Sequence, residues 1–137
     1  MHDVMIDSSV WIEYFRNGVG RISDNVDYLI DHDRVALCGI IELEIIQGMR
    51  PKERTRIISL FDALHYIETT RTDYKTAGEY LGRLRAKGIS IPSTDSLISA
   101  LCFRKNLQLF STDRHFDAFS DIKRYNLINV RHGNQQL

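Results

Sequence analysis

Acidic residues occur at three places in the chain where a carboxylate can serve metal-dependent chemistry. Asp7 closes a short apolar run, 4–6, and Asp113 follows a second run, 107–112. Ligands of open α/β sheets bind outside the carboxyl ends of the strands, so acids that directly follow strand-like runs indicate a site. Asp95 lies in the first turn of a predicted helix, where free backbone N–H groups favour an ionised carboxylate.

A fourth acid, Glu44, lies in the predicted helix 40–47 with apolar residues on nearly every side. This pattern predicts burial of much of the helix circumference. An ionised glutamate is costly there unless a cation or a hydrogen-bonding partner compensates it. Glu42 is two residues away and points in a different direction, so only one of the two acids can join a given site.

Convergence of these acids would require a hard cation, because carboxylates that share a site repel one another. Mg²⁺ and Mn²⁺ suit oxygen ligands. Neither C-x-x-C spacing nor an i, i+4 histidine pair is present to indicate zinc. The histidines are interpreted as surface residues rather than ligands: His2, His32, His65, His115 and His132.

Each of three acids also has a purely structural interpretation. Asp7 can cap a helix that begins near Ser8 or Ser9, which are themselves good N-cap residues. Asp95 can be ordinary first-turn helix chemistry. Asp113 can be a turn residue in Ser-Thr-Asp-Arg. Position in the sequence leaves these alternatives open.

Alternating strand and helix patterns must position the acids. Strands are predicted at 4–6, 35–38 and 107–110, with a brief strand or plain connection at 66–67. Helices are predicted near 10–15, 22–32, 40–47, 51–61, 74–84 and 93–106, and the fifth of these has Tyr74, Ala77, Leu81 and Leu84 on one face. This alternation predicts a single α/β domain, 1–137, with a mostly parallel sheet covered on both faces.

Composition leaves the partner open but restricts the class of protein. The 137 residues are 43% hydrophobic with a net charge of +0, so the chain is not a strongly basic nucleic-acid binder as a whole. Two local basic runs are either phosphate contacts or solvated helix faces: Arg50, Lys52, Arg54 and Arg56, and Arg83, Arg85 and Lys87. Without a leader pattern or an apolar run of about 18 residues, a soluble cytoplasmic protein with two buried thiols is expected.

Four motifs together resemble the PIN-domain ribonucleases, particularly VapC toxins of type II toxin–antitoxin pairs. They are Val4–Ile12 around Asp7, Glu44–Gly48, Thr94–Ala100 around Asp95, and Ser111–Phe116 around Asp113. The order and separations match over positions 4 to 116. Only Glu44 has a glycine four residues later, which favours it over Glu42. Ser8 and Ser111 stand where the family commonly has Thr, and His115 stands where another acid is common.

The resemblance implies a three-layer α/β/α PIN-like fold and a Mg²⁺-dependent endoribonuclease, with Mn²⁺ as a possible substitute. Asp7 and Asp95 would hold the metal most directly, and Glu44 and Asp113 would complete the catalytic pocket. Ser9 and Ser111 are interpreted as substrate-binding residues. The resemblance further implies a structured RNA substrate, a VapB-like antitoxin and a homodimer, with Trp11, Tyr14, Phe15, Ile45 and Ile46 as candidates for the apolar contact surface.

Two other functions are compatible with a fold of this kind. A non-catalytic RNA-binding or protein-interaction module would use the same acids structurally. An aspartyl-phosphate enzyme also has an Asp after a parallel strand, but Asp7-Ser8-Ser9 lacks the Asp-x-Asp nucleophile motif and no Lys follows a clear late strand.

Overall fold

Short strands alternate with helices along the chain, as the sequence predicts. The computed structural model describes residues 1–130, whose strands are β1 (Val4–Ile6), β2 (Val35–Cys38), β3 (His65–Ile67), β4 (Gln108–Phe110) and β5 (Lys123–Arg124). The α-helices are α1 (Ser8–Asn17), α2 (Arg21–Asp31), α3 (Gly39–Gly48), α4 (Arg54–Asp62), α5 (Arg71–Ala86) and α6 (Ser93–Lys105). Two short 3-10 helices are η1 (Pro51–Glu53) and η2 (Arg114–Ala118).

All strand pairs in the sheet are parallel, and the strand order is β3-β2-β1-β4-β5. The chain builds outward from β1 through β2 to β3, then crosses back to place β4 on the other side of β1. This reversal makes the carboxyl ends of β1 and β4 a topological switch point, where α/β sheets bind ligands. Ile6 and Phe110 are in register there, so the residues that follow each strand start side by side.

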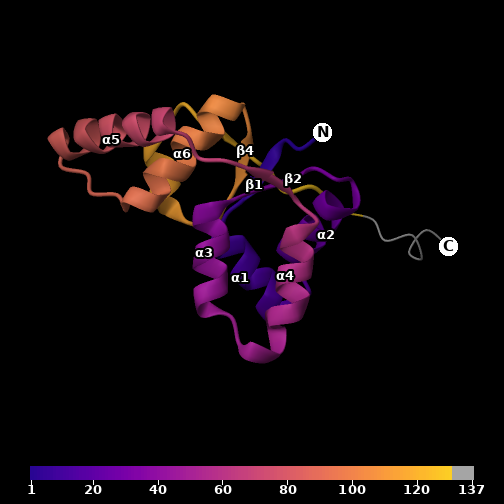
Figure 1. The fold of residues 1–137 in the computed structure, drawn as a ribbon. Coiled ribbons are helices and arrows are strands. Elements are labelled where there is room, and N and C mark those ends of the chain that lie inside the picture. The colour runs from indigo at the N-terminus through magenta and orange to yellow at the C-terminus, as the bar shows by residue number, and fades with distance from the viewer. Residues whose placement is uncertain (131–137) are drawn as a thin grey trace.

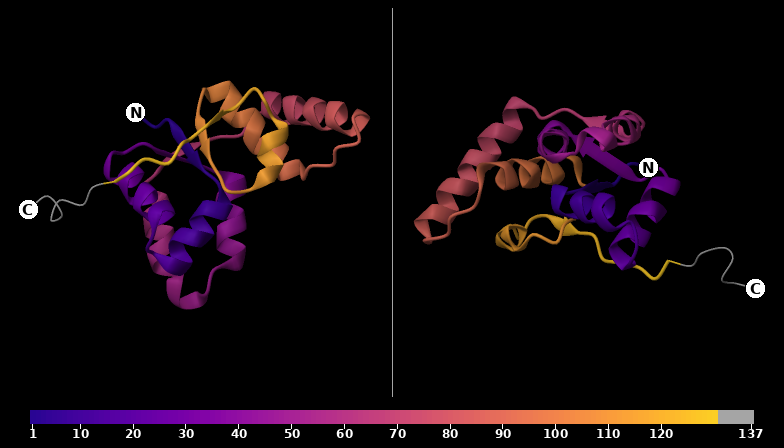
Figure 2. Two further views of the ribbon diagram at one scale, coloured as in Figure 1. Left: turned by 180° about the vertical axis from the view of Figure 1, so that it is seen from behind. Right: turned by 90° about the horizontal axis from the view of Figure 1, so that it is seen from below.

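Helices flank the sheet in a three-layer α/β/α arrangement, which confirms the predicted fold class. Figure 1 shows α5 and α6 together on one side of the molecule, with α1, α3 and α4 grouped on the other. Figure 2 gives the same arrangement from behind and from below, with the chain from β5 onward running past α2. None of the helices within residues 1–130 has the length and apolar character needed to cross a bilayer.

Helix α6 positions Asp95 because it is buried around its whole circumference. Its residues from Asp95 through Cys102 are all buried, and the Ser96 hydroxyl donates a 2.9 Å hydrogen bond to the Ala77 carbonyl of α5. Asn106 ends the helix in the left-handed conformation. A helix held on all sides gives its N-terminal acid little freedom to move.

The predicted core face of α5 is wrong in its first position. Tyr74 is 58% exposed, whereas the buried residues of α5 are Asp73, Ala77, Tyr80 and Leu84. Asp73 is buried because its carboxylate receives the Arg104 guanidinium from α6 at 2.7 and 2.9 Å and caps the Thr70 backbone N–H at 2.9 Å. A buried carboxylate is tolerated when its oxygens are hydrogen-bonded, and a pattern of apolar residues in the sequence cannot predict such partners.

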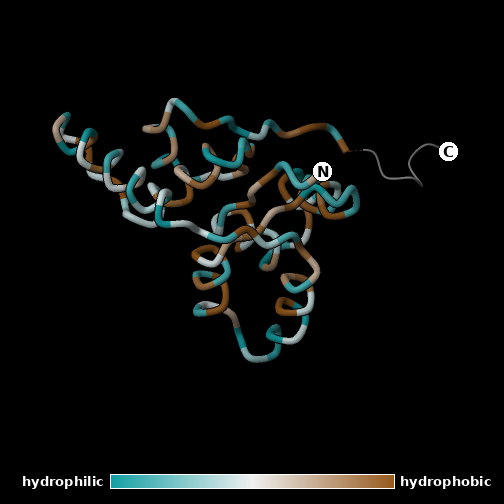
Figure 3. Tube along the Cα trace, turned by 45° about the horizontal axis from the view of Figure 1, so that its top comes forward, coloured by the Kyte–Doolittle hydropathy of each residue, from teal (hydrophilic) through white to brown (hydrophobic). Residues whose placement is uncertain are grey.

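Helix α3 is also more exposed than its sequence predicts. Only Ile41 and Ile45 of this helix are buried, and Leu43 is 60% exposed. Figure 3 shows apolar segments recurring along both α3 and α4, with a hydrophilic connection joining them. The apolar surface of α3 is therefore larger than the described part of the chain covers.

Two strand assignments add detail to the prediction. The brief strand expected at Tyr66 and Ile67 forms as β3 and pairs with β2. β5 was not predicted, because its two residues, Lys123 and Arg124, carry no apolar pattern. Its pairing with β4 covers the edge of the sheet beside the predicted site.

Candidate active site

Asp7 lies where β1 passes directly into α1. Its backbone N–H donates to the Phe110 carbonyl at 2.9 Å, which holds the ends of β1 and β4 together. Asp7 is also the N-cap of α1, with Oδ2 accepting from the Ser9 N–H at 3.4 Å. The cap is thus Asp7 itself rather than Ser8 or Ser9. Because it is buried, this carboxylate also requires further hydrogen bonds.

Two serine hydroxyls provide those bonds. Ser9 Oγ and Ser111 Oγ donate to Asp7 Oδ2 at 2.8 and 2.9 Å. Ser9 Oγ also accepts from the Thr112 N–H at 3.2 Å, and Ser111 Oγ from the Asp113 N–H at 3.0 Å. Within residues 1–130 the hydrogen bonds to this carboxylate all reach Oδ2, so Oδ1 is left for a ligand. Ser9 and Ser111 therefore orient Asp7, and substrate binding by either serine stays a prediction.

Glu44 faces the same site from α3. Its Oε1 accepts a 3.2 Å hydrogen bond from Ser8 Oγ. Burial raises the pKa of Glu44 and the nearby carboxylates Asp7, Asp95 and Asp113 raise it further, while the Ser8 bond lowers it. Glu42 instead lies near Tyr66: burial is the main cause of the raised pKa of Tyr66, and the negative charge of Glu42 contributes to it. The geometry therefore agrees with the choice of Glu44 over Glu42.

Asp95 and Asp113 both lie close to the Nδ1 atom of His115. His115 Nδ1 lies 3.0 Å from Asp95 Oδ2 and 3.2 Å from Asp113 Oδ1. Asp113 is the N-cap of η2, and its Oδ1 accepts from the His115 N–H at 2.9 Å. Burial raises the pKa of Asp95, as do Asp113 and Asp7, and the hydrogen bond from His115 opposes this rise.

The four predicted acids therefore converge from β1, α3, α6 and the segment after β4. Two of them, Glu44 and Asp95, have raised pKa values, mainly because they are buried and further because neighbouring carboxylates oppose their ionisation. A divalent cation among the oxygens would remove that repulsion. The donor set is oxygen-rich with one imidazole, which fits a hard divalent cation such as Mg²⁺ or Mn²⁺.

Sequence reasoning missed two members of this cluster. Ser8 was interpreted as a helix cap and as a substitute for a common motif Thr, and its bond to Glu44 was not predicted. His115 was interpreted as a surface residue, which describes its half-exposed ring but not its contacts with two acids. The available signal was its place in the fourth motif, two residues after Asp113, where another acid is common. His132 lies outside the described residues.

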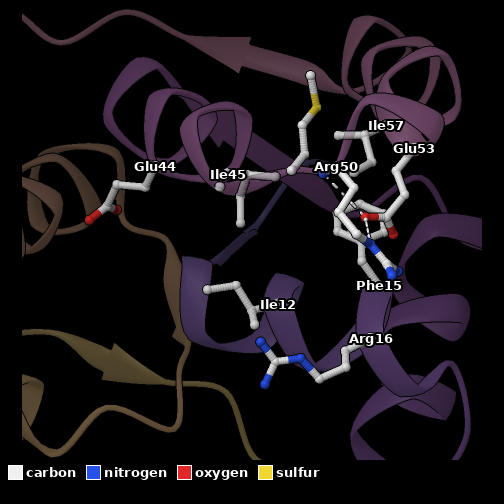
Figure 4. Close-up of a pocket in the computed structure, with 10 residues that line it drawn as sticks. Ile12, Phe15, Arg16, Glu44, Ile45, Arg50, Glu53 and Ile57 are labelled. Carbon is white, nitrogen blue, oxygen red and sulfur yellow. Dashed lines mark hydrogen bonds and ion pairs between the residues drawn. The ribbon is translucent and has the colours of Figure 1, made fainter.

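A groove of about 530 Å³ opens beside the acids, between α1, α3 and α4. Figure 4 shows Glu44 at one end of it and Phe15, Arg50 and Glu53 gathered at the other. Ile12 is the exposed apolar residue in its lining, at 45% exposure. Of the residues proposed from sequence as a contact surface, Trp11 and Ile45 are buried in the core, whereas Phe15 is partly accessible and lines the groove.

Comparison with known proteins identifies related chains of similar length. The family model described as "PIN domain" matches residues 4–122, which include all four acids. Ribonuclease VapC11 of Mycobacterium tuberculosis is 28% identical over 124 residues, which cover 87% of this chain and 92% of the relative. Ribonuclease VapC21 of the same species is 26% identical over 114 residues, covering 80% and 83%.

Solved structures with the same fold include DNA-bound VapBC from Salmonella typhimurium, with a TM-score of 0.77 and 18% identity over 91% of this chain and 98% of that one. FitAcB from Neisseria gonorrhoeae has a TM-score of 0.72 and 23% identity over 90% and 96%. At these identities the likeness concerns the fold.

Proposed function

The chain belongs to the PIN-domain family, and we propose that it is a metal-dependent endoribonuclease that acts as the toxin of a VapBC-like toxin–antitoxin pair. The observation that carries this proposal is the convergence of Asp7, Glu44, Asp95 and Asp113 at the switch point of the sheet. Acids held this close favour a bound cation, and the curated relatives reported above are named as ribonucleases.

In the proposed site, Asp7 and Asp95 hold the cation most directly, and Glu44 and Asp113 complete the pocket. Mg²⁺, or Mn²⁺ in its place, would lower the pKa of a water molecule and neutralise charge that develops on the phosphoryl oxygens. Ser9 and Ser111 keep Asp7 oriented through Oδ2. Hydrogen bonds from neighbouring hydroxyl groups fix the direction of a metal-binding carboxylate in this way.

Glu44 is the residue best suited to accept a proton from the attacking water at Oε2. Its Oε1 is held by Ser8, and burial, the main cause of its raised pKa, makes it a stronger base than an ordinary glutamate. Attack on the phosphorus atom by this water would break the P–O3′ bond, the departing 3′ oxygen would take up a proton from solvent, and the products would be a 5′-phosphate and a 3′-hydroxyl. These products distinguish the proposed reaction from cleavage by the RNA 2′-hydroxyl, which leaves a 2′,3′-cyclic phosphate.

The proposed substrate is a structured cellular RNA cut in a single-stranded loop, because a splayed backbone can reach a recessed metal site. Both basic runs of the sequence are exposed: Arg50, Lys52, Arg54 and Arg56 around η1 and α4, and Arg83, Arg85 and Lys87 at the end of α5. Arg50 is already paired with Glu53 at 3.0 Å. The run on α5 is therefore the better candidate to bind phosphates flanking the cut.

The proposed inhibitor is a VapB-like antitoxin segment that occupies the groove between α1, α3 and α4. Its lining joins the exposed Ile12 to Glu44, so a segment bound there would cover an acid of the proposed site. Apolar contacts at Ile12 and Phe15 would provide affinity, and the exposed Arg16 would meet acids at the rim. VapBC complexes among the structural relatives support this partner.

A homodimer is also proposed for the active form. Three exposed aromatic side chains lie on β3 and on the helix pair α5 and α6: Tyr66, Tyr74 and Phe103. Exposed aromatic residues are enriched in protein–protein interfaces. Light scattering on the purified chain should give twice the monomer mass, and Phe103→Glu should reduce that mass to the monomer value.

Cleavage of an RNA oligonucleotide tests the activity most directly. The purified protein should cut RNA in Mg²⁺ or Mn²⁺, and EDTA should stop it. Asp95→Asn should abolish cleavage without loss of folding, whereas Asp62→Asn, on the exposed end of α4, should leave it unchanged. RNA binding without cleavage in either metal, unaffected by Asp95→Asn, would instead identify a non-catalytic RNA-binding module.

A further inference from the structure

His115 is the one nitrogen donor in the acidic cluster, among the residues that the structure describes. We propose that its Nδ1 is a ligand of the divalent cation, bound together with Asp95 and Asp113, and that this nitrogen shifts the preference of the site from Mg²⁺ toward Mn²⁺. The inference rests on the metal site of the proposed function and adds a ligand and a metal preference to it.

The distances around the ring suit coordination of one ion. Nδ1 lies 3.0 Å from Asp95 Oδ2 and 3.2 Å from Asp113 Oδ1, and the donor atoms of the three residues all lie within 4.8 Å of one another. Neighbouring ligands of an octahedral ion with bonds of about 2.1 Å lie roughly 3.0 Å apart. Small movements would therefore allow all three atoms to bind the same cation.

The backbone that carries His115 is fixed at both sides. The His115 N–H donates to Asp113 Oδ1 at 2.9 Å, and the next residue, Phe116, is completely buried. The ring itself is half exposed, so Nε2 can carry its proton toward solvent while Nδ1 faces the acids. Neutral imidazole is the form of histidine that binds a metal ion through one ring nitrogen.

Ligand chemistry gives the direction of the metal preference. Carboxylate and water ligands suit Mg²⁺ and Mn²⁺ alike, whereas imidazole suits transition-metal ions. An imidazole in place of a further acid also leaves the site with one negative charge fewer. Binding of the hard Mg²⁺ ion depends most on such charges. Mn²⁺ should therefore bind more tightly than Mg²⁺, and His115→Asp should reduce the difference between the two affinities.

A simpler role for His115 is a hydrogen bond from Nδ1–H that only orients Asp95 and Asp113. The two roles differ in a spectroscopic property. A nitrogen bound to Mn²⁺ produces a ¹⁴N coupling in pulsed electron paramagnetic resonance, and a hydrogen-bonded imidazole one shell away does not produce the coupling of a direct ligand.

The experiment uses the metal-stripped full-length chain, Mn²⁺ as the probe and Mg²⁺ as the competitor. Wild type should bind Mn²⁺ with a ¹⁴N coupling, and His115→Gln should lose the coupling. Its Mn²⁺ affinity should fall by about 10- to 100-fold, the size of loss seen when even an outer partner of a metal ligand is removed. His32→Gln is the matched control, because His32 lies at the end of α2 and contacts Tyr28, and it should behave as wild type.

Bound Mn²⁺ without nitrogen coupling, together with unchanged affinity in His115→Gln, would overturn the inference and leave the proposed nuclease intact. Failure of the chain to bind Mn²⁺ or Mg²⁺ at all would overturn the inference and the metal dependence of the proposed function together. A Mn²⁺ to Mg²⁺ preference that is the same in wild type and His115→Asp would refute the claim about selectivity.

Discussion

Replacement of Asp95 by Asn should make the metal-free protein more stable while it removes the proposed activity. Asp95 is buried at the N-terminus of α6, and its ionisation is opposed by burial and by the carboxylates of Asp113 and Asp7. Asn keeps the shape of the side chain and an oxygen that can accept the hydrogen bond from His115. The substitution therefore removes an unfavourable charge and leaves the packing almost unchanged.

The size of the effect follows from the spacing of the cluster. The ligand atoms of Asp95 and Asp113 lie within 4.8 Å of each other. Two unit charges at that separation repel by about 3 kcal/mol at an effective dielectric constant of about 20. His115 and salt offset part of this repulsion, so a net gain of about 1 to 2 kcal/mol is expected at neutral pH. This corresponds to a rise in Tm of roughly 3 to 8 °C.

The dependence on pH has a defined sign. The pKa of Asp95 is raised in the folded state, so its stabilising contribution is complete below the unfolded pKa, near the ordinary value of 3.8, and is lost as pH rises through the folded pKa. Asp95→Asn has no such loss. The stability difference between the variant and wild type should therefore grow as pH rises from acid to neutral.

Urea unfolding in EDTA and in Mg²⁺ measures the effect. In EDTA the variant should have the higher midpoint with the same m-value. Mg²⁺ at 100 times its Kd should then stabilise wild type by about 2.7 kcal/mol and the variant by much less, which reverses their order. Asp62→Asn controls for the substitution itself. A destabilised variant in EDTA, or equal stabilisation of both proteins by Mg²⁺, would refute the view that repulsion among these acids is relieved by a cation.

Three further substitutions test other parts of the structure. Ser111→Ala should weaken Mn²⁺ binding by about 10- to 100-fold in a titration, because Asp7 Oδ2 loses a donor, whereas the exposed Ser120→Ala should have no effect. Asp73→Ala should destabilise the fold by about 2 to 3 kcal/mol in urea, because it removes the buried carboxylate that accepts from the partly exposed Arg104 guanidinium and from the Thr70 N–H. Burial opposes ionisation of Asp73, but Arg104 and Thr70 outweigh it and lower its pKa, so this stability should be present near neutral pH and lost as pH falls through the folded pKa. Ile12→Arg should reduce antitoxin affinity by roughly tenfold or more in calorimetry and leave RNA cleavage by the isolated chain unchanged.

The position of an acid relative to a strand was readable from the sequence, because strand topology alone brings such acids together. Asp7 and Asp113 follow β1 and β4, and parallel pairing of these neighbours aligns their carboxyl ends. The contacts of Ser8 and His115 were not readable, because they depend on how side chains from distant segments meet. The burial of Asp73 in place of Tyr74 was not predicted for a related reason. The Arg104 side chain that pairs with Asp73 is 31 residues away in the sequence.

The wrong prediction for α3 differs from these. Burial of most of this helix was predicted and is not observed, but its apolar sequence is still informative. An apolar helix that leaves Leu43 at 60% exposure has apolar surface that the described part of the chain does not cover. Ile12 on α1 and the groove next to α3 present a further apolar surface beside Glu44. Exposed apolar surface of this kind is characteristic of a binding site for another protein. If a partner covers it, the helix that provides a proposed catalytic acid also provides part of the surface through which the enzyme is inhibited.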